Sequence, residues 1–485
     1  MMPFRHRDLT GYIMDTAKKS FKELRQLHKE FIYKDYSVVK TSDSYHVEYD
    51  FEISGLSEFK AKWDFPVTAA GCTSGRSGED LTDDPIFNKL IFSLGMVECI
   101  SYYKITCPEA FVVKCDDLSD KQLKWWRKLL YNGLGEFMYR NGIDISEDEL
   151  VNITCQYSTG KDGATDSVAS FLHDDHVYDG CLTPVGGGKD SVVSLELLKG
   201  KDIITYTVNG NDTTRAVIDI CDHKSGDYVA KRVLDKRMLD LNAAGYLNGH
   251  TPFSAIVAFS SVIAAYITGR KYITLSNETS ANESTVKDSF VNHQYSKSYE
   301  FECDFGEYLK EITDSDIHYF SMLRPLTELQ IAALFSGFTK YHKAFRSCNA
   351  GSKQGIWCCN CPKCLFVYII LTPFLSEEEL VAIFGEKLLD KESLDKDFRE
   401  LIGIEENKPF ECVGTRAEVA ASMKEFRKRG GKSLLTDRYA QFIDAVTEDG
   451  VKGLLSDRCD EHNVPGELAE IVESAIERYT KEYLR

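Results

Sequence analysis

An excess of basic residues is missing from this chain, and that absence bears on the kind of partner it has. Lysine and arginine number 58 against 76 aspartates and glutamates, which gives a formal net charge of −18 over 485 residues. Proteins that grip a phosphate backbone do so mainly with lysine and arginine. The composition therefore argues against a nucleic-acid partner and favours a small or sugar-linked molecule.

Long apolar segments are also missing. The longest apolar run, 256–267, contains two serines and is shorter than the roughly 20 residues of a membrane span. Residues 1–8 are charged and lack the apolar centre of a secretory signal. We therefore expect a cytoplasmic protein with no membrane partner. Internal repeats and low-complexity stretches are absent from the sequence as well.

The hydrophobic pattern of the first part of the chain predicts an α+β domain over residues 1–165. Apolar and polar side chains alternate over 45–53 and 59–65, which is typical of strands with one wet face. Two helix-like stretches and a short apolar strand are expected at 86–103, 120–140 and 110–113. We expect this domain to recognise part of the substrate.

From about residue 170, apolar strands alternate with helical stretches. This βαβα order predicts an α/β fold with a doubly wound parallel sheet over 166–345, which binds ligands at the carboxyl ends of its strands. The expected elements lie at 181–185, 191–198, 203–208, 213–220, 228–234, 252–268 and 272–275. Pro184 fits a central strand poorly because it lacks a backbone donor. Residues 346–485 read as a helical C-terminal region.

The sharpest local motif is a glycine-rich loop between a strand and a helix. It comprises Gly186, Gly187, Gly188, Lys189, Asp190 and Ser191. Its glycines allow backbone N–H groups to surround a phosphate, and the helix that follows aims its positive end at the same place. Lys189 can add a point charge, and Asp190 can position Mg²⁺.

The loop fails two related patterns and resembles a third. It lacks the Gly-Lys-Ser/Thr of a Walker A loop and the G-x-G-x-x-G spacing of dinucleotide-binding folds. It is similar to the S-G-G-x-D-S loop of PP-loop ATP pyrophosphatases, with Gly186 in place of serine. That resemblance implies cleavage of ATP between its α- and β-phosphates. Asn209, at the end of the next strand, is either an adenosine contact or a turn residue.

A cysteine array follows the predicted sheet. Cys348, Cys358, Cys361 and Cys364 have the spacing C-x9-C-x2-C-x2-C, and Cys359 can replace Cys358. Four thiolates at such spacing typically form a structural Zn²⁺ site. An iron–sulfur cluster and free thiols are the alternatives, because C-x2-C-x2-C also begins a ferredoxin-type run.

Two families share these features. The loop and the cysteine array together resemble 7-cyano-7-deazaguanine synthase, a shorter PP-loop enzyme that adenylates a carboxylate and carries a four-cysteine zinc site. A longer resemblance is to the UDP-N-acetylmuramoyl-L-alanyl-L-glutamate epimerase family of bacteria. The segments that carry it are 101–104 (SYYK), 133–137 (GLGEF), 184–191, 249–252 (GHTP), 276–278 (SNE), 291–298 (VNHQYSKS) and 408–414 (KPFECVG).

The second resemblance implies a reaction and a set of site residues. ATP would adenylate the carboxylate of the terminal L-glutamate, which makes its α-proton removable, and the D-epimer, AMP and pyrophosphate would be released. His250 and His293 are acid/base candidates, since imidazole titrates near neutrality. Lys297 can act as a base or hold phosphate, and Cys412 can be a second acid/base on the opposite face. Asn277 and Glu278 follow a strand and can hold Mg²⁺ or nucleotide.

Three rival functions remain open at this point. One is another PP-loop carboxylate-activating enzyme that forms an amide or a nitrile, although no glutaminase nucleophile domain is apparent. Another is a tRNA-modifying PP-loop enzyme, which the acidic total disfavours. The last is a nucleotide-binding module without catalysis. The sequence leaves the oligomeric state open.

Overall fold

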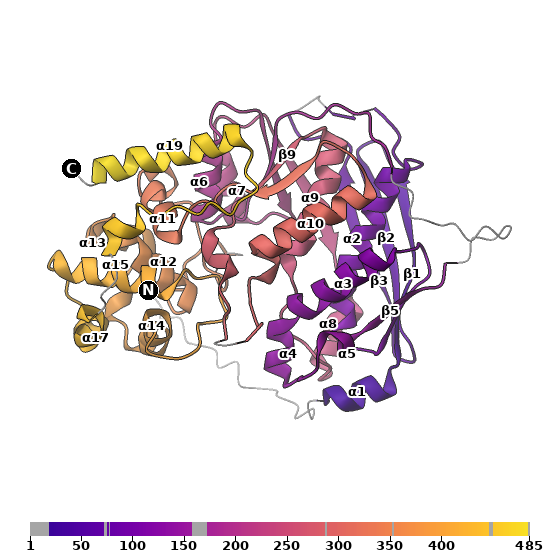
Figure 1. Cartoon of the computed structure of the whole chain (residues 1–485), viewed down its shortest axis with the longest axis horizontal. Helices are drawn as coiled ribbons and strands as arrows, with labels where there is room; N and C mark the ends of the chain where they lie inside the picture. Colours follow the sequence, from indigo (N-terminus) through magenta and orange to yellow (C-terminus); the bar gives the residue numbers. More distant parts are fainter. Residues whose placement is uncertain are drawn as a thin grey trace, which may run out of the picture.

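The computed structural model describes residues 19–71, 75–76, 78–157, 172–286, 289–351, 354–445 and 450–483. The charged stretch 1–8 and the domain boundary expected near residue 165 lie outside these ranges. Figure 1 shows the N-terminal strands at one end of the molecule and the C-terminal helices at the other, with the elements around the glycine-rich loop between them.

One ten-stranded sheet joins the N-terminal and middle parts of the chain, in the order β10-β9-β6-β7-β8-β3-β2-β1-β4-β5. Its N-terminal strands are β1 (Glu30–Lys40), β2 (Ser44–Ile53), β3 (Ser57–Pro66), β4 (Ala110–Val113) and β5 (Asn152–Cys155). Those of the middle part are β6 (Cys181–Pro184), β7 (Ile203–Val208), β8 (Gly226–Val233), β9 (Tyr272–Leu275) and β10 (His318–Ser321).

The α/β fold class is confirmed, with one difference in the sheet. The strands β10 to β8 are all parallel, as the alternating pattern predicts. Strands β1, β2 and β3 are joined by short turns and therefore pair antiparallel. Strand β3 also pairs antiparallel with β8, and this pairing joins the N-terminal strands to the parallel half. The N-terminal region is thus continuous with the middle region through the sheet.

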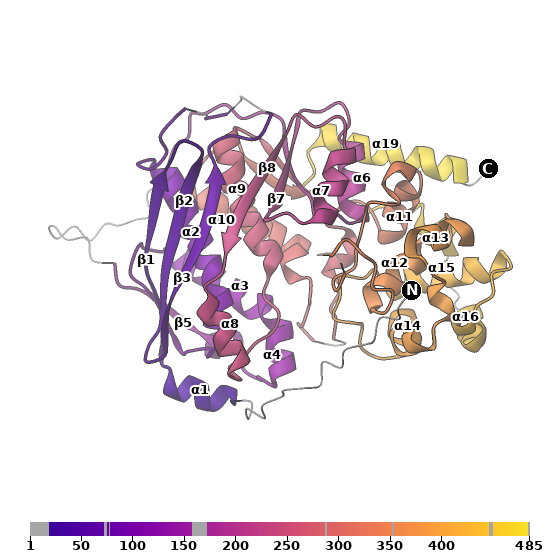
Figure 2. The same ribbon diagram turned by 180° about the vertical axis from the view of Figure 1, so that it is seen from behind.

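The alternation in β2 and β3 places one face of the N-terminal strands against helices. Aromatic side chains such as Tyr49, Phe51 and Trp63 are buried on that face. The other face carries ion pairs, including Lys60–Asp50 and Lys62–Glu48. Figure 2 shows this second face from outside, with α2 and α9 behind the strands.

Helices cover both faces of the parallel part. The N-terminal helices are α1 (Phe21–Leu27), α2 (Pro85–Tyr103), α3 (Asp120–Gly133), α4 (Gly135–Asn141) and α5 (Glu147–Leu150). Those of the middle part are α6 (Lys189–Leu197), α7 (Asp212–Ile220), α8 (Lys236–Ala243), α9 (Phe253–Thr268) and α10 (Tyr299–Ile312). One apolar core extends from Leu24 to Tyr319, and a second unites the α6 side of the sheet with the C-terminal helices.

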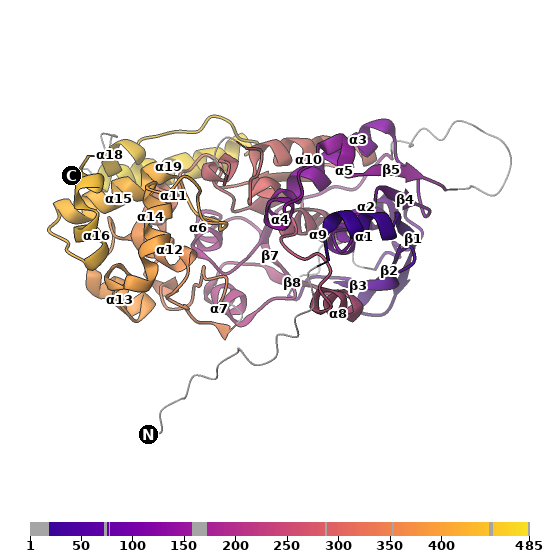
Figure 3. The same cartoon turned by 90° about the horizontal axis from the view of Figure 1, so that it is seen from below.

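The C-terminal region is helical, as expected. Its helices are α11 (Glu328–Ser336), α12 (Pro362–Leu371), α13 (Glu377–Phe384), α14 (Asp395–Ile402), α15 (Arg416–Lys428), α16 (Leu434–Arg438), α17 (Ala440–Asp444), α18 (Gly450–Leu454) and α19 (Gly466–Tyr483). Figure 3 shows them gathered on the α6 side of the molecule. Among the described residues, no helix has the length and apolar character that crossing a membrane requires.

Pro184 ends β6 where its missing donor does no harm. Residues Cys181 and Val185 donate backbone N–H groups to β7, so Pro184 faces the other neighbour, β9. The pairing with β9 stops at Leu182. The chain is therefore free to turn into the glycine-rich loop at this point.

Candidate functional site

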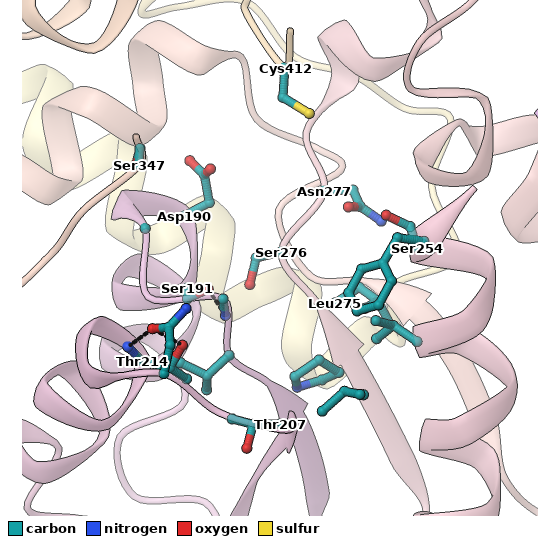
Figure 4. A pocket seen from close by; sticks show the side chains of 18 of the residues that line it. Asp190, Ser191, Thr207, Thr214, Ser254, Leu275, Ser276, Asn277, Ser347 and Cys412 are labelled. Atoms are coloured by element: carbon teal, nitrogen blue, oxygen red, sulfur yellow. Dashed lines mark hydrogen bonds between the residues drawn. The ribbon is translucent and has the colours of Figure 1, made fainter. Parts of the chain in front are cut away.

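A cavity of about 400 Å³ opens at the carboxyl ends of the parallel strands. This is the place where α/β sheets bind ligands, and the volume suits a small molecule. Its walls come from the glycine-rich loop, the ends of β7 and β9, the start of α9 and the C-terminal region (Figure 4). The lining includes Gly186, Gly188, Asp190, Ser191, Thr207, Gly210, Asn211, Ser254, Asn277, Lys297, Ser347, Lys363 and Cys412.

The glycine-rich loop turns tightly into α6. Gly187 adopts φ +84°, and a Cβ there would lie 3.0 Å from Thr213. The Gly186 N–H donates to Ser191 Oγ over 3.0 Å. Helix α6 begins at Lys189, whose N–H donates to Ser347 Oγ, and its next residues, Asp190 and Ser191, line the cavity. The loop has the strand–turn–helix setting that the sequence predicts.

Lys189 does not reach the cavity. Its side chain is fully buried and its ammonium pairs with Asp190 and Glu328. Burial opposes the charge of Lys189, but these two carboxylates outweigh that effect and raise its pKa. The Asp190 carboxylate, by contrast, lines the cavity. The Lys189 charge that we expected at the phosphate is therefore paired with Glu328 instead. Glu328 is the first residue of α11 and lies outside the glycine-rich motif.

Of the three predicted nucleotide or Mg²⁺ contacts Asn209, Asn277 and Glu278, only Asn277 lines the cavity. Asn209 has φ +64°, and its side chain bonds the backbone of Arg232 through both of its polar atoms. It is therefore a turn residue, while its neighbour Asn211 lines the cavity. Asn277 also lines the cavity, but Glu278 is buried and accepts a hydrogen bond from Ser280.

A second group of polar side chains converges at the far wall of the cavity. Lys297 Nζ donates to Cys412 Sγ over 3.1 Å, and His293 lies close enough to that sulfur for the two groups to shift each other's pKa. The other side of His293 lies on a buried carboxylate, with Nδ1 2.5 Å from Glu136 Oε2. His250 Nδ1 lies 3.4 Å from the same oxygen.

Cys412 lies beside His293 rather than across from it, which differs from the expected opposite-face placement. The segment that carries Cys412 is tied back toward the cavity, because Lys363 donates to the Cys412 carbonyl oxygen. In Figure 4 the Cys412 and Asp190 side chains point into the same open space. The long-range contacts of this segment, rather than any local pattern, determine that position.

The two histidines are driven to opposite charge states. Burial and the positive charge of His293 lower the pKa of His250 to about 4. Burial also opposes charge on His293, but hydrogen bonds to Cys412 and Glu136 outweigh it and raise the pKa to about 9. Near neutral pH the pair therefore holds one free base and one acid.

Cys412 is held as a thiolate. Burial opposes its charge, but Lys297 and His293 outweigh that effect and lower the pKa of the thiol to about 6. Cys412 and Lys297 line the cavity, whereas His250 and His293 are not part of its lining.

Buried basic side chains hold this group in place. Arg324, wholly buried, donates to the backbone oxygens of Glu278 and Lys297. Lys104 donates to the Gly249 carbonyl oxygen and to Thr251 Oγ1, which flank His250. Donor atoms of Glu136, His250 and His293 lie within 4.8 Å of one another. Arg140, 2.5 Å from Glu136, adds positive charge, which favours proton transfer over cation binding there.

The four-cysteine array forms one compact cluster. The sulfurs of Cys348, Cys358, Cys361 and Cys364 lie within 4.8 Å of one another, so they can hold a metal ion. Cys359 turns away and donates to the Phe384 carbonyl oxygen, so it is not an alternative ligand to Cys358. Backbone N–H groups of Gly351 and Cys364 donate to sulfurs of the cluster, which stabilises thiolates.

Family comparisons agree with this architecture. A family model described as the MurL N-terminal domain matches residues 22–322, and one described as the MurL C-terminal domain matches residues 338–448. The chain belongs to the MurL family. The first match ends just after β10, and the second begins just after α11.

Several curated relatives share the name UDP-N-acetyl-alpha-D-muramoyl-L-alanyl-L-glutamate epimerase. The protein of Xanthomonas oryzae pv. oryzae is 32% identical over 69% of this chain and 74% of its own length. That of a Micromonospora species is 36% identical over 68% and 73%, and that of Salinispora tropica is 35% identical over 74% and 77%. No solved structure matches the chain.

Sequence reasoning missed several residues that the MurL fold brings to the site. Glu136 lies in the segment 133–137, Ser347 precedes Cys348, and Lys363 lies between two cysteines of the array. Each was thus close to a recognised motif. Their contacts with His293, Lys189 and Cys412 are long-range, and no local spacing indicates them.

Proposed function

We propose that this protein is an ATP-dependent epimerase that converts the terminal L-glutamate of UDP-N-acetylmuramoyl-L-alanyl-L-glutamate to D-glutamate, in synthesis of peptidoglycan precursors. The relatives' names support the substrate. One structural observation carries the chemistry: a single cavity is lined both by the glycine-rich loop and by the Cys412–Lys297 pair. This shared lining supports a phosphate site next to a proton-transfer site.

The loop is proposed to hold ATP while the substrate carboxylate attacks its α-phosphorus. Backbone N–H groups of Gly187, Gly188, Asp190 and Ser191 would bind the pyrophosphate. The Asp190 carboxylate lines the cavity and would hold Mg²⁺, whose charge would offset that of the phosphates. Asn277 faces the same space and can position the nucleotide. AMP then joins the carboxylate, and pyrophosphate leaves.

The histidines are proposed to move the α-proton. Neutral His250 accepts it, and protonated His293 returns a proton, which matches the separated pKa values of the pair. Lys297, whose pKa is raised by Cys412 and Glu278 against the effect of burial, supplies a permanent positive charge near the carbonyl oxygen.

The cysteine cluster is proposed to hold one structural Zn²⁺. Four closely spaced sulfurs match a tetrahedral site with no open position. It would fix the segment between Ser347 and Lys363, both of which line the cavity. The N-terminal region, which supplies Glu136 and Lys104, is proposed to recognise the UDP-sugar end of the substrate.

The decisive assay combines the purified protein with ATP, Mg²⁺ and the L-glutamate substrate in D₂O. We expect substrate-dependent pyrophosphate and AMP, together with deuterium at the α-carbon of a D-glutamate product. Pyrophosphate without deuterium would indicate a different carboxylate-activating reaction. Absence of pyrophosphate would refute the proposal.

Replacing Gly187 with alanine should weaken ATP binding. The added Cβ would lie 3.0 Å from Thr213 and 3.1 Å from the Thr214 nitrogen, at φ +84°. We expect the KM for ATP to rise by about 10-fold or more, because the loop must shift. The matched control is Gly200→Ala, which has φ +92° but no atom within 4 Å of its Cβ. Both variants should lose roughly 1 kcal/mol of stability, and Gly200→Ala should keep the wild-type KM.

The pH dependence of kcat/KM should show a basic limb near pH 9, where His293 loses its proton. Glu136 and Cys412 stabilise the imidazolium, so Glu136→Gln should move that limb to lower pH. The value of kcat/KM should also fall as the pH drops through about 6, because protonation there removes the negative charge of the Cys412 thiolate. Lys297 keeps its charge over this range because its pKa is raised, whereas burial lowers the pKa of Lys104 to about 8, so the Lys104→Met variant is needed to separate its titration from that of His293. A basic limb unchanged in Glu136→Gln would contradict the assignment of His293.

A further inference from the structure

We infer that Cys412 is a catalytic nucleophile that displaces AMP, so that the glutamyl group is inverted as a thioester on the enzyme. This inference rests on the proposed adenylation. It gives Cys412 a different role from that of the two histidines.

The position of the sulfur suits attack on an adenylate. In an acyl adenylate, one oxygen separates the acyl carbon from the α-phosphorus, so a nucleophile must face the phosphate site. Cys412 lines the same cavity as Gly186 and Asp190, and its side chain points into it (Figure 4). Of the four acid/base candidates, Cys412 and Lys297 line this cavity, whereas His250 and His293 lie outside its lining.

The surroundings of Cys412 are those of an activated thiol. Lys297 Nζ lies 3.1 Å from Sγ, and His293 is close enough to help lower the pKa of the thiol. Glu136, only 6% exposed, orients His293 through a 2.5 Å contact. A nucleophile, a partner base and a third group that orients the base form the usual arrangement of covalent catalysis. Lys363 fixes the backbone of Cys412 from the opposite side.

The steps balance without an added oxidant or reductant. The thiolate attacks the acyl carbon, a C–S bond forms, and the C–O bond to AMP breaks as AMP leaves with the electron pair. After the α-proton has been removed and returned, water attacks the thioester carbon. The C–S bond then breaks, the sulfur leaves as thiolate, the carboxylate is restored, and the protons of the water pass to solvent.

A thioester would also help the inversion itself. Sulfur donates little electron density to a carbonyl group, so the α-proton of a thioester is more acidic than that of a carboxylate. Departure of AMP removes a negatively charged phosphate from beside the developing enolate. Lys297, already next to the sulfur, can stabilise the enolate oxygen.

The test measures pyrophosphate and AMP separately in single turnovers of Cys412→Ala and Cys412→Ser with ATP, Mg²⁺ and the L-glutamate substrate. We expect both variants to form pyrophosphate but to release AMP at least about 100-fold more slowly than the wild type, with no D-epimer. Cys459→Ala, a half-buried cysteine away from the cavity, should release both products as the wild type does. Acid-quenched wild type should carry the glutamyl adduct on the peptide that contains Cys412.

The outcomes separate this inference from the function on which it rests. If Cys412→Ala or Cys412→Ser releases AMP as fast as pyrophosphate, the thioester is wrong, whether or not the epimer forms. An adduct on another residue would refute it as well. If the wild type releases no pyrophosphate at all, the proposed adenylation fails, and the thioester fails with it.

Discussion

Replacing Asp190 with asparagine should lower the rate of substrate-dependent pyrophosphate release by about 10²- to 10³-fold, while the fold persists. Asp190 is the carboxylate of the glycine-rich loop that lines the cavity. Asparagine keeps its shape but removes the charge that would hold Mg²⁺ against the phosphates. The loss should appear mainly in kcat for pyrophosphate formation.

The fold should survive because Lys189 keeps a partner. Lys189 is fully buried and pairs with both Asp190 and Glu328. Burial and the Asp190 charge raise the pKa of Glu328 to about 8, even though Lys189 opposes this shift. Removing the Asp190 charge removes one of the effects that raise this pKa, which favours the ionised form of Glu328 beside Lys189.

The measurement is single-turnover pyrophosphate release, with thermal unfolding as the fold check. Asp219→Asn is a suitable control, because Asp219 is an exposed carboxylate on α7 outside the cavity lining. It should change the rate by less than roughly twofold. Wild-type turnover in Asp190→Asn would show that the loop does not bind the phosphates as proposed.

Local pattern was enough to predict the strands and helices around the glycine-rich loop. The elements expected at 203–208 and 272–275 coincide with β7 and β9. Apolar strands alternating with helices bury their side chains on both faces, and this pattern is readable over a few residues. The cysteine spacing likewise predicts a cluster, because Cys361 and Cys364 lie within a single turn.

Pairing between distant segments was not predictable in this way. Strand β1 and its pairing with β4 were missed because its polar and apolar residues do not alternate evenly. The partnership of Lys189 with Glu328 spans 139 residues, and that of His293 with Glu136 spans 157. Such contacts depend on how the sheet and the C-terminal helices pack, and a motif of six residues carries no information about them.

The same limit applies to Cys412, which sequence reasoning offered only as a second acid/base. Sequence reasoning placed Cys412 and the histidines on opposite faces because epimerisation needs access to both sides of a carbon. In the structure Cys412 accepts a hydrogen bond from Lys297 and lies near His293, which in turn contacts Glu136. A cysteine in that setting is better suited to bond formation than to independent proton transfer.

The cysteine cluster gives the other large effect expected. Cys358→Ser should lower the bound metal from one ion per chain by about tenfold or more, and it should destabilise the C-terminal region by about 3 kcal/mol or more. Cys359→Ser is the matched control, since the neighbouring Cys359 donates to the Phe384 carbonyl oxygen rather than joining the cluster. It should keep the metal. The measurements are elemental analysis and thermal unfolding.

Activity should fall with the metal in Cys358→Ser, because the cluster anchors two walls of the cavity. Ser347 is adjacent to Cys348, and Lys363, which holds the Cys412 carbonyl oxygen, lies between Cys361 and Cys364. Loss of the metal should therefore displace Cys412. Both AMP release and formation of the D-epimer should then be abolished. If elemental analysis found iron with sulfide in the wild type, the same four ligands would hold an iron–sulfur cluster and not zinc. Equal metal content in Cys358→Ser and Cys359→Ser would exclude the four-sulfur site, since only one of the two side chains faces it.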